Sequence, residues 1–571
     1  MSWLKLNRQK VLVLILLLAT FVFIHRFFFL PGDFSTHDGV HFIRLYDLEK
    51  VLREGQFPPR WLPNLGKGYG YPFFNFYPPL SYFVGLAFRF LGASFTLANK
   101  LSFAMAGLVG GLGMFYFGKL LFGFWGGSVA ALFWLFLPYR AVDLYVRGSL
   151  AEYWGMNLLP WAFYFAKNLF DHQNLKRFLL FTFSLFLLLV AHNAVSLISS
   201  IWLVIFIIFL LAVNHDWSGK NLRQKSLLTI SFLLALGLAS FFVFPAILEK
   251  DFTHIADMTS DYYTYSNHFP SLGQLFISRF WGYGGSNFGL NDGISFQIGH
   301  LHWLLALLAL VLLIRDFFLN RKVFFGKKSS LLAIFFVISF WGAAFLSHQR
   351  SLFIWKLLPF LGFLQFPWRL LIFIGFSASI LAGFSISRLA KKNFFIFAAL
   401  FLVLVGLTFS YFKPEAIADI SDDDYLSSPV WEYQQREFLT DYLPAAVKVI
   451  PEDYYHPPLV IGGEETEIKL DQAGRVVFLT SAREDKEIVI KRFYFPGWQA
   501  KINQKPMEIK SNQNGFIVLP LSEGRSLVEI SFEDTLTRKI ANWISLLSWG
   551  LFLGLILIIV YQQVFIKERY D

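Results

Sequence analysis

The sequence predicts a polytopic α-helical membrane protein of about twelve transmembrane helices with a small extracytoplasmic all-β domain near the C-terminus. Apolar runs of about twenty residues recur along a chain of 571 residues, of which 56% are hydrophobic. Short clusters of Lys and Arg separate these runs, and the stretch 413–540 changes instead to alternating polar and apolar residues. Because a soluble domain cannot bury this much apolar surface, the runs are predicted to lie in lipid.

The N-terminus is predicted to be an uncleaved membrane anchor. An apolar run from Val11 to about Leu30 follows the basic residues Lys5, Arg8 and Lys10, and it has no small-residue cleavage site. This run is long enough to span a bilayer, and the basic residues before it place the N-terminus in the cytoplasm.

The composition excludes several classes of site and partner. The formal net charge is +11, but the Lys and Arg residues flank apolar runs as they do in membrane proteins, so no nucleic-acid partner is expected. The chain has no cysteine, which excludes disulfides and thiolate-bound metal centres. A divalent cation such as Mg or Mn would need carboxylate or imidazole ligands, and nothing in the sequence requires one.

The basic clusters choose between two topologies. The apolar segment from Pro78 to Gly92 is only about fifteen residues long, which is short for a span and suits a helix that lies in the membrane interface. If this segment does not cross, every basic cluster falls in a cytoplasmic loop, whereas counting it as a span puts the later clusters outside. We therefore expect a multi-pass protein of the cytoplasmic (plasma) membrane with both termini inside. The clusters lie around Lys119, Arg177, Lys220, Lys327, Lys391 and Lys567.

Three regions follow from this topology. Residues 1–412 form a multispanning domain with outer loops at 31–98 and 247–299, and spans are expected at 99–121 and 125–139 among others. Residues 413–540 form an extracytoplasmic, mainly β domain, because alternation in 465–470 and 487–491 is separated by turn signals such as Asn514-Gly515. Residues 541–571 hold the final span and a cytoplasmic tail. Within the β domain, Trp498 is a candidate sugar-stacking platform or a core residue, and we favour the core.

The first candidate site follows the first span, in the stretch Thr36-His-Asp-Gly-Val-His41. Asp38, next to His37, has the chemistry of a general base toward an acceptor hydroxyl and could also bind a divalent cation if one is present. His41 would share a face with His37 if the stretch is helical, and would then contact substrate. The alternative is a solvated loop that only caps the next helix.

Further along the same loop, Arg60 and Tyr77 lie in a stretch rich in Pro, Gly and aromatic residues. Glycines let backbone approach a ligand closely, and aromatic faces stack on sugar rings or flank lipid headgroups. Arg60 and Tyr77 are therefore candidate substrate-binding residues. The alternative is an aromatic-belt loop packed at the interface.

The next outward loop holds a second set of charges. Arg140, Asp143 and Arg147 are spaced at i, i+3 and i+7, which puts them on one face of a helix, and Glu152 follows. Two guanidinium groups with a carboxylate between them could clamp a phosphate or diphosphate of the substrate. The alternative is an ion-paired helix end at the membrane surface.

Two more candidates lie at span ends on the same side of the membrane. His192 begins a span and could bind substrate or only cap the helix, and Arg369 in Gln365-Phe-Pro-Trp-Arg369 could meet a lipid phosphate or only anchor the helix. The centres of the spans hold few ionisable residues, whereas a transporter usually carries them there. This one-sided clustering favours an enzyme that acts on a lipid-linked substrate. A lipid or polysaccharide transporter and a non-catalytic envelope scaffold remain the alternatives.

Several motifs carry a resemblance to known membrane proteins. Pro78-Pro-Leu-Ser-Tyr82 after an acidic residue resembles the GT-C class of integral-membrane glycosyltransferases. The chain is more closely similar to bacterial membrane proteins of the YfhO-like group and to those described as 6-pyruvoyl-tetrahydropterin synthase-related. The zinc-ligand histidines of the soluble synthase are not recognisable, so pterin chemistry is not expected. The motifs of this closer resemblance are Tyr145–Glu152, Gln365–Arg369, Asp441–Pro444 and Tyr494–Trp498.

The resemblance implies a GT-C-like fold and an inverting transfer of a sugar from a polyprenyl-phosphate-linked donor to a lipid or glycan acceptor of the cell envelope. It implies that Asp38 is the catalytic base or a metal-linked acid. A paired Asp-x-Asp motif is absent from the first loop, which leaves metal dependence open.

Overall fold

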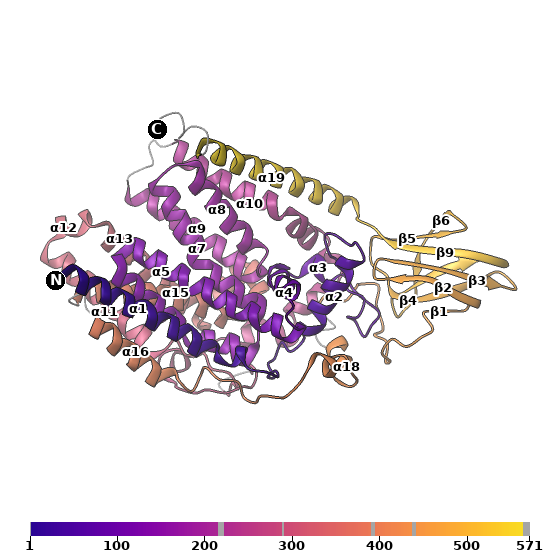
Figure 1. Cartoon of the computed structure of the whole chain (residues 1–571), viewed down its shortest axis with the longest axis horizontal. Coiled ribbons are helices and arrows are strands. Elements are labelled where there is room, and N and C mark those ends of the chain that lie inside the picture. The colour runs from indigo at the N-terminus through magenta and orange to yellow at the C-terminus, as the bar shows by residue number, and fades with distance from the viewer. Residues whose placement is uncertain (1, 215–221, 288–290, 390–393, 437–440, 564–571) are drawn as a thin grey trace.

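The computed structural model describes residues 2–214, 222–287, 291–389, 394–436 and 441–563. It is a bundle of long helices with a β domain at one end (Figure 1), which confirms the predicted fold class. The first helix, α1, begins at the end of the bundle away from the β domain, and the last helix, α19, runs from the β domain back toward that end. We call the end that carries the β domain the β end.

Among the described residues, eight helices are long and apolar enough to cross a membrane. Counting α5 as two arms gives nine, and the expected total of about twelve also needs α7, α8 and α16 of the same bundle, of which α8 and α16 have only 15 residues each. The helices are α1 (Ser2–His25), α5 (Phe95–Leu135), α7 (Leu150–Asp171), α8 (Leu175–Leu189), α9 (Asn193–Val213), α10 (Leu222–Leu248), α11 (His300–Leu319), α13 (Lys328–Leu346), α15 (Leu371–Leu389), α16 (Phe394–Thr408) and α19 (Leu536–Tyr561).

Helix α5 is a hairpin of two arms. Its 41 residues would make a straight helix of about 60 Å, twice the thickness of the hydrocarbon core. Gly123 breaks it with a φ of 76°, a conformation that glycine adopts without strain. A Cβ on Gly118 would lie 2.9 Å from the Cα of Gly127, so the arms pack closely side by side. The predicted spans 99–121 and 125–139 correspond to these arms, although the second arm already ends at Leu135.

The short apolar segment after residue 78 forms α4 (Leu80–Phe90), which has 11 residues. At 1.5 Å per residue it is about 16 Å long, too short to cross a bilayer, as the sequence indicates. It lies beside α2 (His41–Arg53) near the β end (Figure 1), and Phe90 and Leu91 at its end are exposed. The position fits a helix that rests in the interface.

The β domain consists of two antiparallel sheets with the strand orders β1-β4-β8-β7 and β2-β3-β9-β5-β6. Alternate residues such as Phe478 and Ile488 are fully buried, so the inner faces of the sheets form one core. Trp498 belongs to this core and packs edge-on against Trp61, as favoured above. The strands are β1 (Val460–Ile461), β2 (Glu464–Gln472), β3 (Arg475–Ala482), β4 (Lys486–Phe493), β5 (Trp498–Ile502), β6 (Lys505–Met507), β7 (Lys510–Ser511), β8 (Phe516–Leu521) and β9 (Gly524–Phe532).

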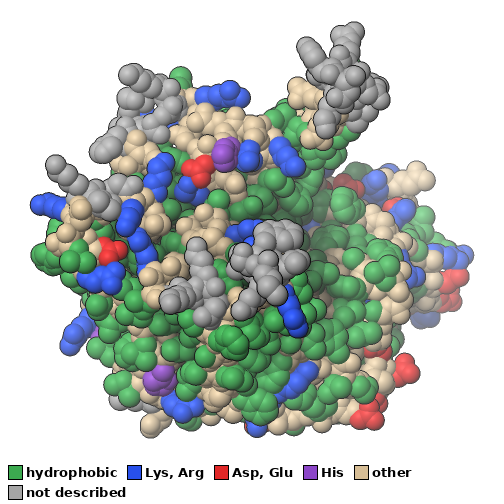
Figure 2. Space-filling model, turned by 60° about the vertical axis from the view of Figure 1, so that its left-hand side comes forward, with side chains coloured by type: hydrophobic (Ala, Val, Ile, Leu, Met, Phe, Trp, Pro, Cys, Tyr) green, Lys and Arg blue, Asp and Glu red, His purple; other side chains and the backbone are tan. Residues whose placement is uncertain are grey.

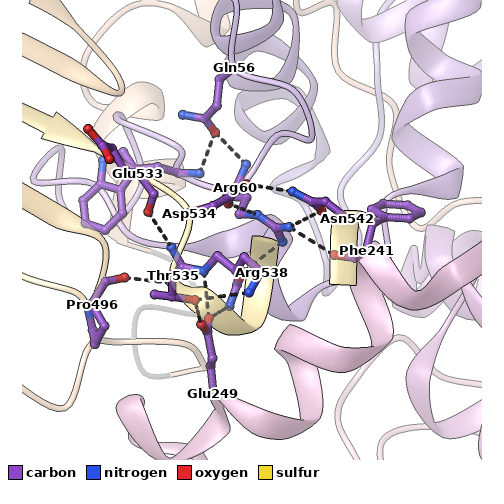
Figure 3. Close-up of polar contacts among 12 residues, drawn as sticks. Gln56, Arg60, Phe241, Glu249, Pro496, Glu533, Asp534, Thr535, Arg538 and Asn542 are labelled. Carbon is purple, nitrogen blue, oxygen red and sulfur yellow. Dashed lines mark hydrogen bonds and ion pairs between the residues drawn. The ribbon is translucent and has the colours of Figure 1, made fainter. Parts of the chain in front are cut away.

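A buried polar junction fastens the β domain to the bundle (Figure 3). Arg538 at the start of α19 is fully buried, and its Nε lies 2.8 Å from Oε2 of Glu249, which follows α10. The same guanidinium donates to the carbonyl of Pro496 in the β domain. Arg60 donates to Asp534 at 3.1 Å and to Asn75 at 3.1 Å. Because each charge has a partner of opposite sign, the junction avoids the penalty of an isolated buried charge.

Basic side chains gather at the end of the bundle opposite the β domain. Figure 2 turns this end forward and shows many Lys and Arg side chains with few Asp and Glu beside a large hydrophobic surface. The short helix α12 (Arg321–Gly326) lies at this end in Figure 1. The predicted basic positions Lys220, Lys391 and Lys567 lie outside the described residues.

Candidate functional site

A cavity of about 840 Å³ opens at the β end, where α8 and α10 end and α9 begins. One part of its wall is polar and the other is apolar. The apolar part, which we call the apolar arm, lies between the first turns of α9 and the last turns of α10 and is lined by Leu189, Ala194, Leu197, Phe242, Val243, Ala246 and Ile247. The ionisable and tyrosine side chains of the wall belong to His37, Asp38, Arg44, Tyr77, Arg147, His192, Lys250, Tyr262, Tyr263, Arg369, Asp441 and Tyr442.

The loop that carries Asp38 is paired with the loop that carries Arg147. The backbone N–H of Asp38 donates to the carbonyl of Arg147 at 2.8 Å, and that of His37 donates to Val146 at 3.0 Å. Gly148 makes this approach possible: its φ is 63°, and a Cβ there would lie 2.1 Å from Oγ1 of Thr36. Asp38 and Arg147, which we expected on the same side of the membrane, are therefore in direct contact through their backbones.

The carboxylate of Asp38 lines the cavity and has no hydrogen bond or ion pair with any residue that the structure describes. His37 lines the cavity beside it, and its Nε2 contacts the carbonyl of Tyr283 at 2.9 Å. Since a carbonyl only accepts, the proton of a neutral His37 lies on Nε2 and Nδ1 is left as the acceptor.

His41 is buried behind this loop and does not line the cavity. Its Nε2 lies 2.6 Å from the carbonyl of Gly148, and its Nδ1 lies 3.0 Å from the hydroxyl of Tyr82. Burial lowers the pKa of His41 to about 4, so the ring is neutral at neutral pH. His41 therefore supports the Gly148 turn, in place of the substrate contact expected from the sequence.

Glu152 holds two arginines of the cavity wall. Its Oε1 lies 2.8 Å from Nη1 of Arg147, and its Oε2 lies 2.9 Å from Nε of Arg369. Glu152 is fully buried and Asp143 pairs with Arg147 at 2.6 Å from the other side. Glu152 and Asp143 thus orient the guanidinium groups from behind, while Arg147 and Arg369 face the cavity.

Arg140 lies away from this pair. It is fully buried in the bundle, where it donates to the side chains of Tyr153 and Asn157, and it does not line the cavity. The expected shared helical face assumed an α-helix, but residues Asp143–Arg147 form a π-helical turn. A π turn takes more residues than an α turn, so Arg140 and Arg147 point in different directions.

His192 has a fixed tautomer. Its Nδ1 accepts a hydrogen bond from the backbone N–H of Val195 at the start of α9, so the ring proton lies on Nε2. Burial lowers the pKa of His192 to about 3, which keeps the ring neutral. Nε2 is 3.9 Å from Oε2 of Glu152, too far for a hydrogen bond, so His192 presents a neutral donor at the cavity wall.

Aromatic rings complete the wall around the arginines. Trp368 stacks between Phe296 and Phe366 at centroid distances of 5.7 and 4.7 Å, and the guanidinium of Arg147 lies 5.0 Å from its ring. Tyr77, as expected from the sequence, lines the cavity and stacks on Phe73. These stacked rings restrict the side chains that face a ligand.

The structure thus divides the eleven predicted site residues into three groups. His37, Asp38, Tyr77, Arg147, His192 and Arg369 line the cavity; His41, Asp143 and Glu152 lie behind them; Arg60 and Arg140 lie elsewhere. The cavity also holds polar residues that were not predicted, among them Arg44, Lys250, Tyr263, Gln365, Asp441 and Tyr442. The motifs Asp441–Pro444 and Gln365–Arg369 include three of them, but a sequence motif does not show which side chains meet in a cavity.

Asp38 does not belong to a ready-made metal centre. Over the described part of the chain, no three His, Asp or Glu side chains are close enough to hold a metal ion together. A cation held by Asp38 would complete its coordination with water or with oxygens of the substrate.

Comparisons with solved structures find similar helix arrangements at low identity. The apo oligosaccharyltransferase of Archaeoglobus fulgidus matches with a TM-score of 0.47 at 12% identity, over 80% of this chain and 62% of that one. ArnT from Cupriavidus metallidurans bound to undecaprenyl phosphate matches with a TM-score of 0.42 at 13% identity, over 69% of this chain and 63% of that one. Both are of the GT-C class. These scores are low, so the assignment of a reaction rests on the geometry of the site.

Sequence comparisons identify the family. An uncharacterized protein of Lactococcus lactis subsp. cremoris (strain MG1363) is 24% identical over 244 residues, which are 42% of this chain and 39% of that protein. The chain thus spans less than two thirds of this relative and of both solved structures. The family model described as "6-pyruvoyl-tetrahydropterin synthase related domain; membrane protein" matches residues 74–414, more than half of the chain. The chain therefore belongs to the 6-pyruvoyl-tetrahydropterin synthase related family of membrane proteins.

Proposed function

We propose that this protein is a glycosyltransferase of the cytoplasmic membrane that moves a sugar from a polyprenyl-phosphate-linked donor to a lipid or glycan acceptor on the outer face. The observation that carries the proposal is the cavity itself. A single space brings together the carboxylate of Asp38, the guanidinium groups of Arg147 and Arg369, and the apolar arm between α9 and α10. A base, an anion site and a lipid site are what this reaction needs.

The donor phosphate is assigned to Arg147, Arg369 and the Nε2–H of His192. Guanidinium groups bind phosphate oxygens through charge-assisted hydrogen bonds, and Glu152 fixes both groups before the ligand arrives. The prenyl chain is assigned to the apolar arm. Leu197 and Ile247 line this arm and remain exposed, so it is accessible to a chain that enters from the bilayer.

Asp38 is assigned as the general base. Its carboxylate takes the proton of the acceptor hydroxyl, and the hydroxyl oxygen attacks the anomeric carbon of the donor sugar. The bond from that carbon to the phosphate oxygen breaks, and its electron pair leaves with the phosphate. The arginines stabilise the charge that grows on this leaving group, and the configuration at the anomeric carbon is inverted.

The outer location follows from the basic residues. Lys and Arg concentrate at the end opposite the β domain, and cytoplasmic loops carry the excess of these residues. The cavity and the β domain are therefore assigned to the outside and both termini to the cytoplasm.

The orientation is tested with single-cysteine variants. Because the natural chain has no cysteine, Ser522→Cys and Lys328→Cys each carry one reactive thiol. An impermeant maleimide should label the first on intact cells and the second only after permeabilisation, and the reverse result would overturn the orientation.

The activity is tested with the purified full chain in lipid nanodiscs and a panel of polyprenyl-phosphate sugars and envelope acceptors. Asp38→Asn should lower kcat by about 10²- to 10⁴-fold, the usual contribution of a general base, with the protein still folded and inserted. The matched control is Asp423→Asn, which neutralises an exposed carboxylate on α17 (Asp422–Tyr425). No transfer by the wild-type protein, or full transfer by Asp38→Asn, would refute the proposal and favour a transporter or a scaffold.

A further inference from the structure

We propose that Asp441, together with Tyr263 and Tyr442, forms a carbohydrate subsite that binds hydroxyl groups of a pyranose ring in the cavity. The inference rests on the proposed function and adds the group that recognises the sugar itself. All three side chains line the cavity. None of them is used above for the phosphate, the proton or the lipid chain.

The segment that carries Asp441 is held from two sides. The backbone N–H of His254 donates to Leu443 at 3.0 Å, and that of Ala445 donates to Phe252 at 2.8 Å, so the segment pairs with the chain that follows α10. Its other end reaches the β domain, where the N–H of Val449 donates to the carbonyl of Gln513 at 2.9 Å. We call residues 441–449 the strap. It carries Asp441 and is fastened to both the bundle and the β domain.

Stacked rings fix the neighbouring residue. Tyr442 lies almost parallel to Phe76, with an interplanar angle of 11° and a centroid distance of 5.7 Å. This stacking holds the backbone at Asp441 against the cavity wall. A pre-positioned carboxylate is what selective binding of a small polar ligand requires, because little entropy is then lost when the ligand binds.

Tyr263 lines the same cavity as the two carboxylates, Asp38 and Asp441. Burial raises its pKa, and the charges of Asp441 and Asp38 raise it further, so both carboxylates act on the same hydroxyl. Tyr263 therefore stays protonated, with an O–H that can donate and an oxygen that can accept. A sugar ring bound beside it would share one cavity with Asp38, the assigned base, and with Asp441.

The chemistry of these groups selects a sugar over a phosphate. A carboxylate repels a phosphate, so Asp441 cannot serve the anion that Arg147 and Arg369 bind. It accepts strong, charge-assisted hydrogen bonds from hydroxyl groups, and its two oxygens match two adjacent hydroxyls of a pyranose. The aromatic ring of Tyr263 suits the C–H surface of such a ring, while Tyr442, stacked on Phe76, shapes the wall beside it.

Binding of methyl pyranosides tests the subsite without any need for turnover. Wild-type protein in nanodiscs is titrated with the methyl glycosides of glucose, galactose, mannose and N-acetylglucosamine, and binding is followed by saturation-transfer NMR. At least one should bind, Asp441→Asn should weaken it at least tenfold, and Asp423→Asn should leave it unchanged. If no pyranoside binds the wild type, or if Asp441→Asn binds equally well, the subsite does not exist.

Two further measurements keep the outcomes distinct. If Asp441→Asn fails to fold, Tyr263→Phe is used instead. Loss of its hydroxyl should weaken binding of the same pyranoside about threefold to tenfold, and an unchanged Kd would contradict the subsite.

The transfer assay gives the second measurement. There, Asp441→Asn should raise the KM of one substrate at least tenfold with little change in kcat. A rise in the donor KM places the donor sugar in the subsite, and a rise in the acceptor KM places the acceptor there. Absent transfer with retained pyranoside binding would refute the proposed function alone.

Discussion

Replacement of Glu152 by Gln tests the central feature of the site, the two arginines held by one buried carboxylate. Glu152 is fully buried, and its oxygens lie 2.8 Å from Arg147 and 2.9 Å from Arg369. After the change Arg147 keeps the counter-charge of Asp143, whereas among the described residues Arg369 keeps only neutral acceptors, namely those of Leu364, Gln365 and the new amide at position 152. The guanidinium of Arg369, which is mostly buried, is then left without a counter-charge.

The magnitude follows from the bonds that are lost. A hydrogen bond to a charged group contributes about 1.5–3 kcal/mol, and removal of one partner from a buried ion pair costs about 3–5 kcal/mol. Glutamine keeps one acceptor oxygen, and Arg369 is partly open to the cavity, so we expect a loss near the lower limit of about 3 kcal/mol in the free energy of unfolding. The KM for the donor should rise at the same time, because the arginines are no longer held in place.

A double-mutant cycle with Arg369→Gln isolates the interaction. The double variant lacks both the carboxylate and the guanidinium that depends on it, so its loss of stability should be smaller than the sum of the single losses by about 1.5–3 kcal/mol. The free energy of unfolding is measured by denaturant titration in mixed micelles with circular dichroism. If the two losses add to within about 0.5 kcal/mol, the two side chains do not interact and the description of the pair is wrong.

Three further predictions concern other parts of the molecule. Gly148→Ala should destabilise the protein by about 1–3 kcal/mol and lower kcat, because its Cβ would meet Thr36 and displace Asp38; unchanged kcat would contradict this. Burial raises the pKa of Asp47 to about 7, so the folded protein keeps a proton that the unfolded chain releases near pH 4. Stability should therefore fall by up to ~4 kcal/mol between pH 4 and 7, and Asp47→Asn should flatten this profile in thermal unfolding. Trp498→Ala should lower the Tm without changing any KM, since the ring is in the β-domain core; a raised KM would instead support sugar stacking.

Hydropathy and charge predict most of the fold because they report on the environment of each segment. Runs of apolar residues identify the helices of the bundle, and the basic clusters exclude α4 as a span. Period-two alternation likewise locates β2 and β4. What these signals cannot show is local backbone geometry, such as the turn at Gly123 that divides α5 into two arms.

The candidate site is predicted less completely because its geometry depends on distant contacts. Spacing alone put Arg140 beside Arg147, but the π turn after Asp143 separates them. Arg60 carried no sign of its partner Asp534, which is 474 residues away. The charge of a group in an outer loop can be read from the sequence, whereas its partner is decided by tertiary packing.

The junction explains how residues from both ends of the chain meet in one cavity. Asn75 donates to Glu249 and accepts from Arg60, which in turn binds Asp534 just before α19. The residues that follow Asn75 and Glu249, among them Tyr77 and Lys250, line the cavity. A displacement of the β domain would therefore pull on two parts of the cavity wall as well as on the strap that carries Asp441. Arg538 donates to the carbonyl of Pro496 in the β domain, and Asp534, the partner of Arg60, closely follows the last strand. Because these contacts tie the β domain to the segments that lead into the cavity wall, the complete cavity and the docked β domain are expected to form together.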